Sequence, residues 1–264
     1  MPESKLLHQM WYDKNIYDNE DPPSKHPKYK TYIQNWRQRN PNLEYCFWNR
    51  RRIEELWKDP RLSRWSDFFK FQIRRHIEKC DFTRYAILWC YGGLYADLDF
   101  DCLRSMESLI NEHDLGLTSE PVEHLKDTPD KDLVPVTNGL MFSMPNHPVW
   151  PGLMDYIQDN YKPNNNVLEN TGPAALARYL HSHPEYPLLD YCLMNPLTKQ
   201  GTVSQQCPVD TLKRAYAVTY WKEGTGWGKE LLWEKLPYFG FYILIGIVII
   251  IGICLYLRSR KYSV

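Results

Sequence analysis

Hydrophobic residues recur along the first 180 positions of the chain with two different spacings. Where they stand at every second position or in short runs we predict strands, and where they recur every third or fourth position we predict helices. The expected strands cover residues 5–11, 43–48, 94–100, 114–118 and 139–143. The expected helices cover residues 29–39, 53–57, 66–79, 82–90, 147–161 and 171–181. This alternation predicts an α/β fold with a mainly parallel sheet.

The last apolar segment is longer than any of these. Residues 237–257 contain no charged side chain, and about 20 apolar residues are enough for a helix to cross a bilayer. Tyrosines stand near both ends and three basic residues follow at once, as is typical of a membrane span. We therefore expect a catalytic domain at residues 1–235, one C-terminal transmembrane helix at 236–257 and a short basic tail at 258–264.

The predicted span makes the chain a single-pass membrane protein, and weaker signals bear on which side its domain lies. No signal-peptide core is seen near the amino end, and no Asn-x-Ser/Thr acceptor occurs. The seven cysteines are an odd number without metal-type spacing, which predicts reduced, buried thiols. These signals slightly favour a cytosolic catalytic domain, whereas the basic tail favours the opposite orientation.

The overall charge limits the possible partners. Lys+Arg and Asp+Glu each number 32, so the chain has no net charge that would attract nucleic acid or acidic lipid in general. We expect no nucleic-acid partner. Any function that depends on charge must come from a local group of residues.

Asp97, Asp99 and Asp101 form such a group. They alternate, so their carboxylates would project to one face if the segment stays extended. A hard divalent cation such as Mn²⁺ or Mg²⁺ relieves the repulsion between such acids, whereas the plain alternative is a solvated acidic turn. The acids follow a predicted helix and Gly92-Gly93, which places them where α/β sheets usually bind nucleotides and favours the metal site.

The surrounding sequence resembles a known family. Residues 81–99, DFTRYAILWCYGGLYADLD, are similar to the signature of the DXD-containing retaining glycosyltransferases. These include the fungal initiating α-mannosyltransferase and the catalytic subunit of mannosyl inositol-phosphorylceramide synthase. Similar motifs at 8–11, 138–148 and 171–173 extend the resemblance over about residues 5–178.

The resemblance implies a fold, a reaction and a set of site residues. The fold would be Rossmann-like, of GT-A type. The enzyme would move a hexose, such as mannose, from a nucleotide-diphosphate sugar donor to a lipid or glycan acceptor, with retention of configuration and with Mn²⁺ or Mg²⁺ as cofactor. Asp97 and Asp99 would be the catalytic and metal-site acids, Asp97 contacting the sugar or ribose and Asp99 the metal at the diphosphate. The donor-binding residues would be His8, Gln9, Trp11, Asp81, Arg84, Tyr91, Gly92, Gly93 and Asn138.

Several of these residues also have a purely structural interpretation. Arg84, three positions after Asp81, could be a surface ion-pair partner. His8 could be a core residue, and Gly92-Gly93 could simply end a helix. Thr171 could cap a helix whose first turn contains Pro173.

One segment departs from the family pattern. Family members end the catalytic domain with a His-containing segment and a Ser-Trp pair, whereas residues 217–227 here read AVTYWKEGTGW and contain no His. Trp227 could keep the aromatic role, and Thr219 or Tyr220 could complete the pocket. The departure leaves a second function open, that of a catalytically inactive, membrane-anchored adaptor that binds sugar nucleotides.

Overall fold

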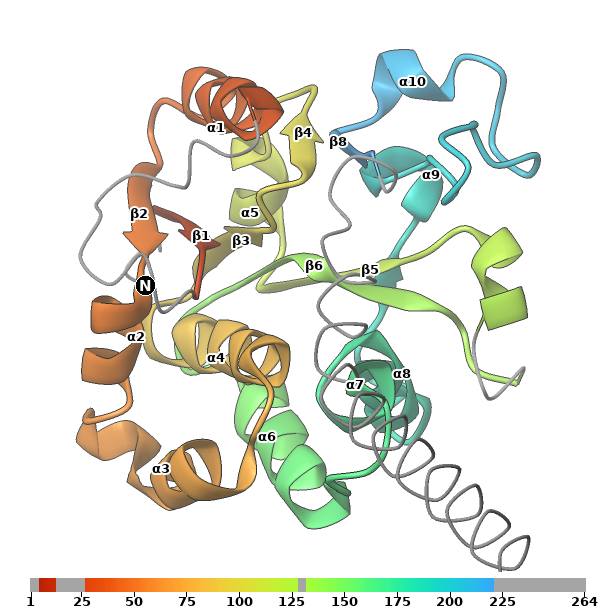
Figure 1. Ribbon diagram of the computed structural model, residues 1–264. Helices are drawn as coiled ribbons and strands as arrows, with labels where there is room; N and C mark the ends of the chain where they lie inside the picture. Colours follow the sequence, from red (N-terminus) through yellow and green to blue (C-terminus); the bar gives the residue numbers. More distant parts are fainter. Residues whose placement is uncertain (1–4, 13–26, 128–131, 221–264) are drawn as a thin grey trace, which may run out of the picture. The chain divides into compact units, whose positions relative to one another are not determined.

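A β-α-β unit opens the fold, as the spacing of apolar residues predicts. The computed structural model describes residues 5–12, 27–127 and 132–220, which lie in one compact unit delimited at residue 222. The β-α-β unit consists of β1 (Leu6–Met10), α1 (Pro27–Arg39) and β2 (Glu44–Trp48) (Figure 1). β1 and β2 pair in parallel, with Leu6 opposite Glu44.

The six-stranded sheet is mixed but mainly parallel, as expected, because one of its strands runs opposite to the other five. Its order is β2-β1-β3-β6-β5-β7. The added strands are β3 (Gly93–Ala96), β5 (Leu115–Ser119), β6 (Val136–Ser143) and β7 (Leu188–Leu189). β6 runs antiparallel to both β3 and β5. The chain between β5 and β6 turns back without the crossover helix that a parallel pair needs, so β6 reverses direction.

The predicted strand at residues 94–100 is interrupted directly after Ala96. The amide of Phe100 donates to the carbonyl oxygen of Asp97 at 3.1 Å and closes a turn. The chain then enters β4 (Phe100–Cys102), which pairs with β8 (Ala217–Thr219) in a separate two-stranded sheet. Asp101 therefore does not share a face with the other two acids, and it accepts a hydrogen bond from Asn35 at 2.8 Å.

Between β2 and β3 the helices differ from those predicted at residues 66–79 and 82–90. The elements are α2 (Arg50–Leu56), η1 (Pro60–Leu62), α3 (Ser63–Asp67), the π-helical turn η2 (Phe68–Gln72) and a long α4 (His76–Tyr91). Ile73 is buried and extended between η2 and α4. Phe69 stacks on Trp57 at 4.3 Å between ring centroids, and Phe68 packs edge-on against Phe82. This packing breaks a segment whose apolar spacing alone would continue as a helix.

Helices cover both faces of the sheet (Figure 1). One face packs against α4, α6 (Val149–Asn160) and α8 (Pro173–His181). The other packs against α1, with α5 (Glu107–Glu112) partly buried beside it. The remaining short elements are η3 (Val122–Asp127), α7 (Val167–Asn170), α9 (Tyr191–Met194) and α10 (Thr211–Arg214).

Two further expectations need correction. Cys192 and Cys207 form a disulfide, so not all cysteines are reduced thiols. The charged, proline-interrupted sequence of residues 120–132 predicts a mobile loop, but part of this segment is held in place. The carboxylate of Glu120 bonds Nδ1 of buried His124 at 2.8 Å, and the amide of Lys199 donates to Nε2 of the same ring at 3.0 Å.

The predicted transmembrane helix at 236–257 and the departing residues 221–227 lie outside the described residues. In the part of the chain that the structure describes, no helix is long and apolar enough to cross a membrane. The domain limits at 235 and 257 therefore stay predictions.

Candidate functional site

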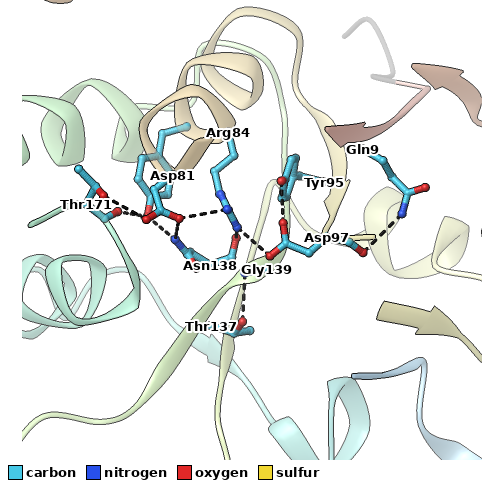
Figure 2. Close-up of polar contacts among 10 residues, drawn as sticks. Gln9, Asp81, Arg84, Tyr95, Asp97, Thr137, Asn138, Gly139 and Thr171 are labelled. Carbon is cyan, nitrogen blue, oxygen red and sulfur yellow. Dashed lines mark hydrogen bonds and ion pairs between the residues drawn. The ribbon is translucent and has the colours of Figure 1, made fainter. Parts of the chain in front are cut away.

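Arg84 is the centre of a buried charge network on α4. It is only 3% exposed, yet its guanidinium lies 3.0 Å from Asp81 Oδ1 and 3.0 Å from Asp97 Oδ2. It also donates to the carbonyl oxygen of Asn138 at 2.8 Å (Figure 2). Burial opposes the charged form of Arg84, but Asp97 and Asp81 outweigh this effect and raise its pKa. Arg84 is therefore a buried cation shared by two acids and not a surface ion-pair partner.

The Asp81 side of this network is fully hydrogen-bonded. Asp81 accepts 3.0 Å bonds from Asn138 Nδ2 and from the hydroxyl of Thr171 (Figure 2). Burial raises the pKa of Asp81 to about 6, although Arg84 acts in the opposite direction. Thr171 does not cap α8, because Gly172 occupies the cap position and Thr171 turns toward Asp81.

Asp97 is aimed by two donors on its own side of the network. Its Oδ1 accepts from the hydroxyl of Tyr95 at 2.7 Å, and its Oδ2 accepts from Arg84 (Figure 2). Its amide donates to the carbonyl oxygen of Gly139 at 2.8 Å, and a Cβ at position 139 would come within 2.8 Å of Oδ2. The side chain is still 32% exposed, so a fixed carboxylate faces an open side.

Asp99 differs from Asp97 because its carboxylate lacks a directly bonded cation within the described ranges: its own backbone amide and the charge of Arg84 favour the ionised form but do not outweigh burial. Across the described residues, its carboxylate has no ion pair and no side-chain hydrogen bond. Partial burial and then the negative charge of Asp97 raise the pKa of Asp99. Burial and the charges of Asp99 and Asp97 also raise the pKa of Tyr29, which places that α1 side chain near the acids.

Asp97 and Asp99 suit a divalent cation that a phosphate group helps to bind. Within residues 5–12, 27–127 and 132–220 no three His, Cys, Asp or Glu side chains gather into a self-sufficient metal site. Mg²⁺ is usually held by one or two carboxylates together with substrate phosphates and water. Asp99 and its oriented neighbour fit that requirement.

Gln9 and Trp11 reach the same end of the sheet from β1. Gln9 Nε2 lies 3.4 Å from the carbonyl oxygen of Asp97. Trp11 belongs to a small apolar cluster with Tyr29 and Leu98, the residue between the two acids. The indole N–H of Trp11 is buried and has no hydrogen-bond partner among the described residues. Both residues therefore lie beside the turn that carries the acids.

Of the other four predicted donor-binding residues, Tyr91, Gly92 and Gly93 lie at the opposite end of β3, and His8 in the middle of β1 bonds to the backbone there. Gly92 ends α4 with a positive φ of 60°, and a Cβ there would come within 2.4 Å of Pro145 N. Gly93 begins β3, where a Cβ would come within 2.5 Å of the carbonyl oxygen of Leu6. Tyr91 is partly exposed and lines a separate cavity of about 470 Å³.

His8 is fully buried with both ring nitrogens bonded. Trp48 Nε1 lies 3.1 Å from Nδ1, and Nε2 lies 2.8 Å from the carbonyl oxygen of Gly92. Burial lowers the pKa of His8 to about 4. This geometry supports the core-histidine and helix-stop interpretations, and a role in donor binding for His8, Tyr91, Gly92 and Gly93 stays a prediction.

The sequence did not identify three side chains of the network, Tyr85, Tyr95 and Thr171, as site residues. Tyr95 stands two positions before Asp97, so the strand period alone places both on one face. Thr171 lies in the stretch 171–173 that resembles the family. Tyr85 OH accepts from Asn138 Nδ2 at 3.0 Å, and no pattern in the sequence marks it.

Comparison with known proteins finds a match to the region that contains the acidic turn. Residues 27–115 match the family model described as the glycosyltransferase sugar-binding region containing a DXD motif. An uncharacterized glycosyltransferase of Acanthamoeba polyphaga mimivirus is 28% identical, over 77% of this chain and 76% of the viral protein.

Two fungal relatives are longer than this chain. Inositol phosphoceramide mannosyltransferase 2 of Schizosaccharomyces pombe is 24% identical, over 96% of this chain and 65% of its own length. A mannosyl phosphorylinositol ceramide synthase of Saccharomyces cerevisiae is 26% identical, over 84% of this chain and 51% of its own length.

Solved structures match more weakly. The PaToxG glycosyltransferase has a TM-score of 0.48 and 14% identity, over 68% of this chain and 69% of the other. Mouse xyloside xylosyltransferase 1 has a TM-score of 0.47 and 11% identity, over 84% of this chain and 97% of the other. The sequence matches confirm the resemblance first seen around residues 81–99: residues 27–115 are similar to the glycosyltransferase sugar-binding region that contains a DXD motif, and the fungal mannosyltransferases extend the similarity along the chain.

Proposed function

We propose that this chain is a glycosyltransferase that moves a hexose, such as mannose, from a nucleotide-diphosphate sugar to a lipid or glycan acceptor, with retention and with Mn²⁺ or Mg²⁺. The observation that carries the proposal is the contrast between two neighbouring acids. Arg84 and Tyr95 hold the carboxylate of Asp97, whereas that of Asp99 is partly buried without an ion pair or a side-chain hydrogen bond among the described residues. Perturbed acids of this kind mark functional sites.

The relatives support the choice of sugar and acceptor. The two fungal proteins are named as enzymes that transfer mannose to inositol phosphoceramide or synthesise its mannosylated form. The chain spans 65% and 51% of their lengths, so their substrates enter here as part of the proposal. DXD glycosyltransferases usually bind a divalent metal.

Asp99 would hold the metal, with Asp97 beside it. When bound, the ion would act as a Lewis acid that neutralises charge on the leaving diphosphate. Asp97, fixed by Tyr95 and Arg84, would accept a hydrogen bond from a hydroxyl of the sugar or ribose. A fixed acceptor needs little rearrangement as charge develops during the reaction.

Transfer with retention can proceed by attack on the face that the diphosphate leaves. The bond between the anomeric carbon and the diphosphate oxygen breaks while a bond to the acceptor oxygen forms. The acceptor proton passes to the leaving diphosphate, so no protein base is assigned. Asn138, held against Asp81 and Tyr85, would help to position the sugar or acceptor.

We also propose that residues 236–257 anchor the enzyme in a membrane, close to a lipid acceptor. The Cys192–Cys207 bond bears on which side the domain lies, because disulfides persist mainly in oxidising compartments. It argues against the cytosolic side that the cysteine count favoured. Protease protection of intact microsomes tests this point, since a digested domain would show a cytosolic location.

The decisive experiment uses the full chain in detergent with a panel of nucleotide sugars. Mass spectrometry should show one donor hydrolysed with Mn²⁺ and not with EDTA. Asp99→Asn should abolish this hydrolysis. Asp101→Asn should retain it, because Asp101 lies in β4 and its carboxylate accepts a hydrogen bond from Asn35 of α1. Hydrolysis that survives Asp99→Asn would refute the proposal, and tight donor binding without turnover would support the inactive adaptor.

A further inference from the structure

The π-helical turn η2 carries a large apolar side chain on the surface. Phe71 is 77% exposed, whereas Phe68 and Phe69 in the same turn are 2% and 3% exposed. The two buried rings pack inward against Trp57 and Phe82. Because they anchor the turn, Phe71 is held outward.

Basic residues stand on both sides of this phenylalanine in the sequence. Lys70 and Arg74 are exposed, and neither has an ion-pair partner within the described residues. Arg64 is 64% exposed although it pairs with Asp155. Asp67, the last residue of α3, is an exposed acid directly before this turn. We call Arg64, Lys70, Phe71 and Arg74 the Phe71 surface.

The charge of this region stands out because the whole chain is neutral. Residues 50–79 contain ten Lys and Arg against five Asp and Glu. They form α2, α3, η2 and the start of α4, which follow one another along one side of the domain (Figure 1). The basic excess of this region is therefore a local charge of the kind on which a function of this neutral chain could depend.

We propose that the Phe71 surface docks on an anionic lipid bilayer. An aromatic side chain among Lys and Arg residues is typical of segments that lie in a membrane interface, where the ring enters the headgroup region. Each basic residue near such a surface strengthens binding by about fivefold. A protein partner would be expected to cover about 800 Å² with a core depleted of lysine, which one ring between Lys70 and Arg74 does not provide.

Docking at this point would bring the acids toward the lipid. η2 is separated from α4 by only three residues, and the first turns of α4 carry Asp81 and Arg84. α4 enters β3 through Gly92, so its amino end lies at the same end of the sheet as Asp97. A lipid acceptor could then reach the site without leaving the bilayer, a consequence that rests on the proposed function.

The test uses the full chain in lipid nanodiscs, because residues 237–257 would bind any vesicle and hide the effect of Phe71. Hydrogen–deuterium exchange of peptides covering residues 68–75 should be at least about fivefold slower in discs with phosphatidylserine than in discs with phosphatidylcholine. Phe71→Ser and the pair Lys70→Glu/Arg74→Glu should each abolish the difference. Val209→Ser and Lys213→Glu, which change an exposed apolar and an exposed basic residue near α10, should leave it intact.

Equal exchange in the two discs would overturn the proposal, as would protection that survives charge reversal. Protection that needs no lipid and grows with protein concentration would assign the surface to a second copy instead. The Phe71→Ser chain should hydrolyse donor in detergent at the wild-type rate. If the wild-type chain lacked that activity while the lipid-dependent protection remained, only the proposed function would fail.

Discussion

The two ends of β3, only four residues apart, differ in how their surrounding groups are bonded and charged. At the Gly93 end the glycine packs against Leu6, and both ring nitrogens of His8 are hydrogen-bonded. At the Asp97 end two acids share one cation, and a third acid, Asp99, has none. The Gly93 end stabilises the fold, whereas the Asp97 end leaves an acid available to bind a ligand.

The difference shows that one continuous motif, residues 91–99, has a structural part and a part that carries the site acids. Residues 91–93 end a helix and start a strand, and residues 97–99 turn the chain away from the sheet. The motif places the acids because its glycines let the chain pass from α4 into β3 in close contact with Pro145 and Leu6. Substitutions at the two ends should therefore fail in different ways.

The largest effect should follow removal of the shared cation. Arg84→Met leaves buried Asp81 and partly exposed Asp97 without their shared cation, which should cost about 3–5 kcal/mol in the free energy of unfolding. Arg64→Met, matched in type but 64% exposed in its pair with Asp155, should cost less than about 1 kcal/mol. Urea unfolding of both variants measures the contrast, and equal losses would show that the network contributes no special stability.

Asp99→Asn should act on turnover and spare the fold. We expect metal-dependent donor hydrolysis to fall about a hundred- to thousandfold, as when one group that stabilises transition-state charge is lost. The free energy of unfolding at pH 7 should stay equal or rise, because burial and the charge of Asp97 disfavour the ionised acid. A variant that loses activity by unfolding, seen as a lowered urea midpoint, would contradict this assignment.

Gly93→Ala should act on the fold and spare donor affinity. The residue has φ +89°, and the new methyl group would meet the carbonyl oxygen of Leu6, so we expect a loss of about 3 kcal/mol. Gly201→Ala also has a positive φ, of 79°, but nothing lies near its Cβ position, so its smaller loss reports backbone strain alone. Donor affinity, measured by calorimetry on the folded fraction, should be unchanged. A large fall in affinity would instead support the predicted donor contact of Gly93.

His8 should give the smallest effect, confined to acid pH. Burial lowers the pKa of His8 from 6.5 to about 4. At a pH between these two values the ring is therefore protonated in the unfolded chain and neutral in the folded chain. Its contribution is complete above pH 6.5 and falls as the pH drops, by about 2 kcal/mol between pH 7 and pH 5. The raised pKa of Asp81 works in the opposite direction at about pH 4 to 6. The difference in unfolding free energy between wild type and His8→Gln, followed against pH, isolates the histidine, and a flat difference would contradict its buried neutral state.

Spacing predicted most of the elements and part of the site. α1, β1, β2 and α6 follow the periodicity closely. Asp81 and Arg84, three positions apart on a helix, meet as predicted, and Asn138 joins them. Gln9 and Trp11 also lie beside the acidic turn.

The errors come from contacts between distant residues. Periodicity carried a helix through Ile73 because it does not register that Phe68 and Phe69 pack on Trp57 and Phe82. It kept the segment after Ala96 extended because the pairing of β4 with β8 joins residues more than 100 positions apart. The Cys192–Cys207 bond was missed for the same reason, since an odd cysteine count says nothing about which thiols meet.

Gly139 limits how this enzyme can change its preference for substrates. Any larger residue there would push against Asp97 Oδ2 and the ring of Phe100, both 2.8 Å from the position of its Cβ. Protein engineering therefore gains little by diversifying position 139, because each new side chain moves the acid before it reshapes a pocket wall. Libraries that aim to alter the sugar or the acceptor should leave this glycine alone and vary neighbours whose side chains do not support the carboxylate.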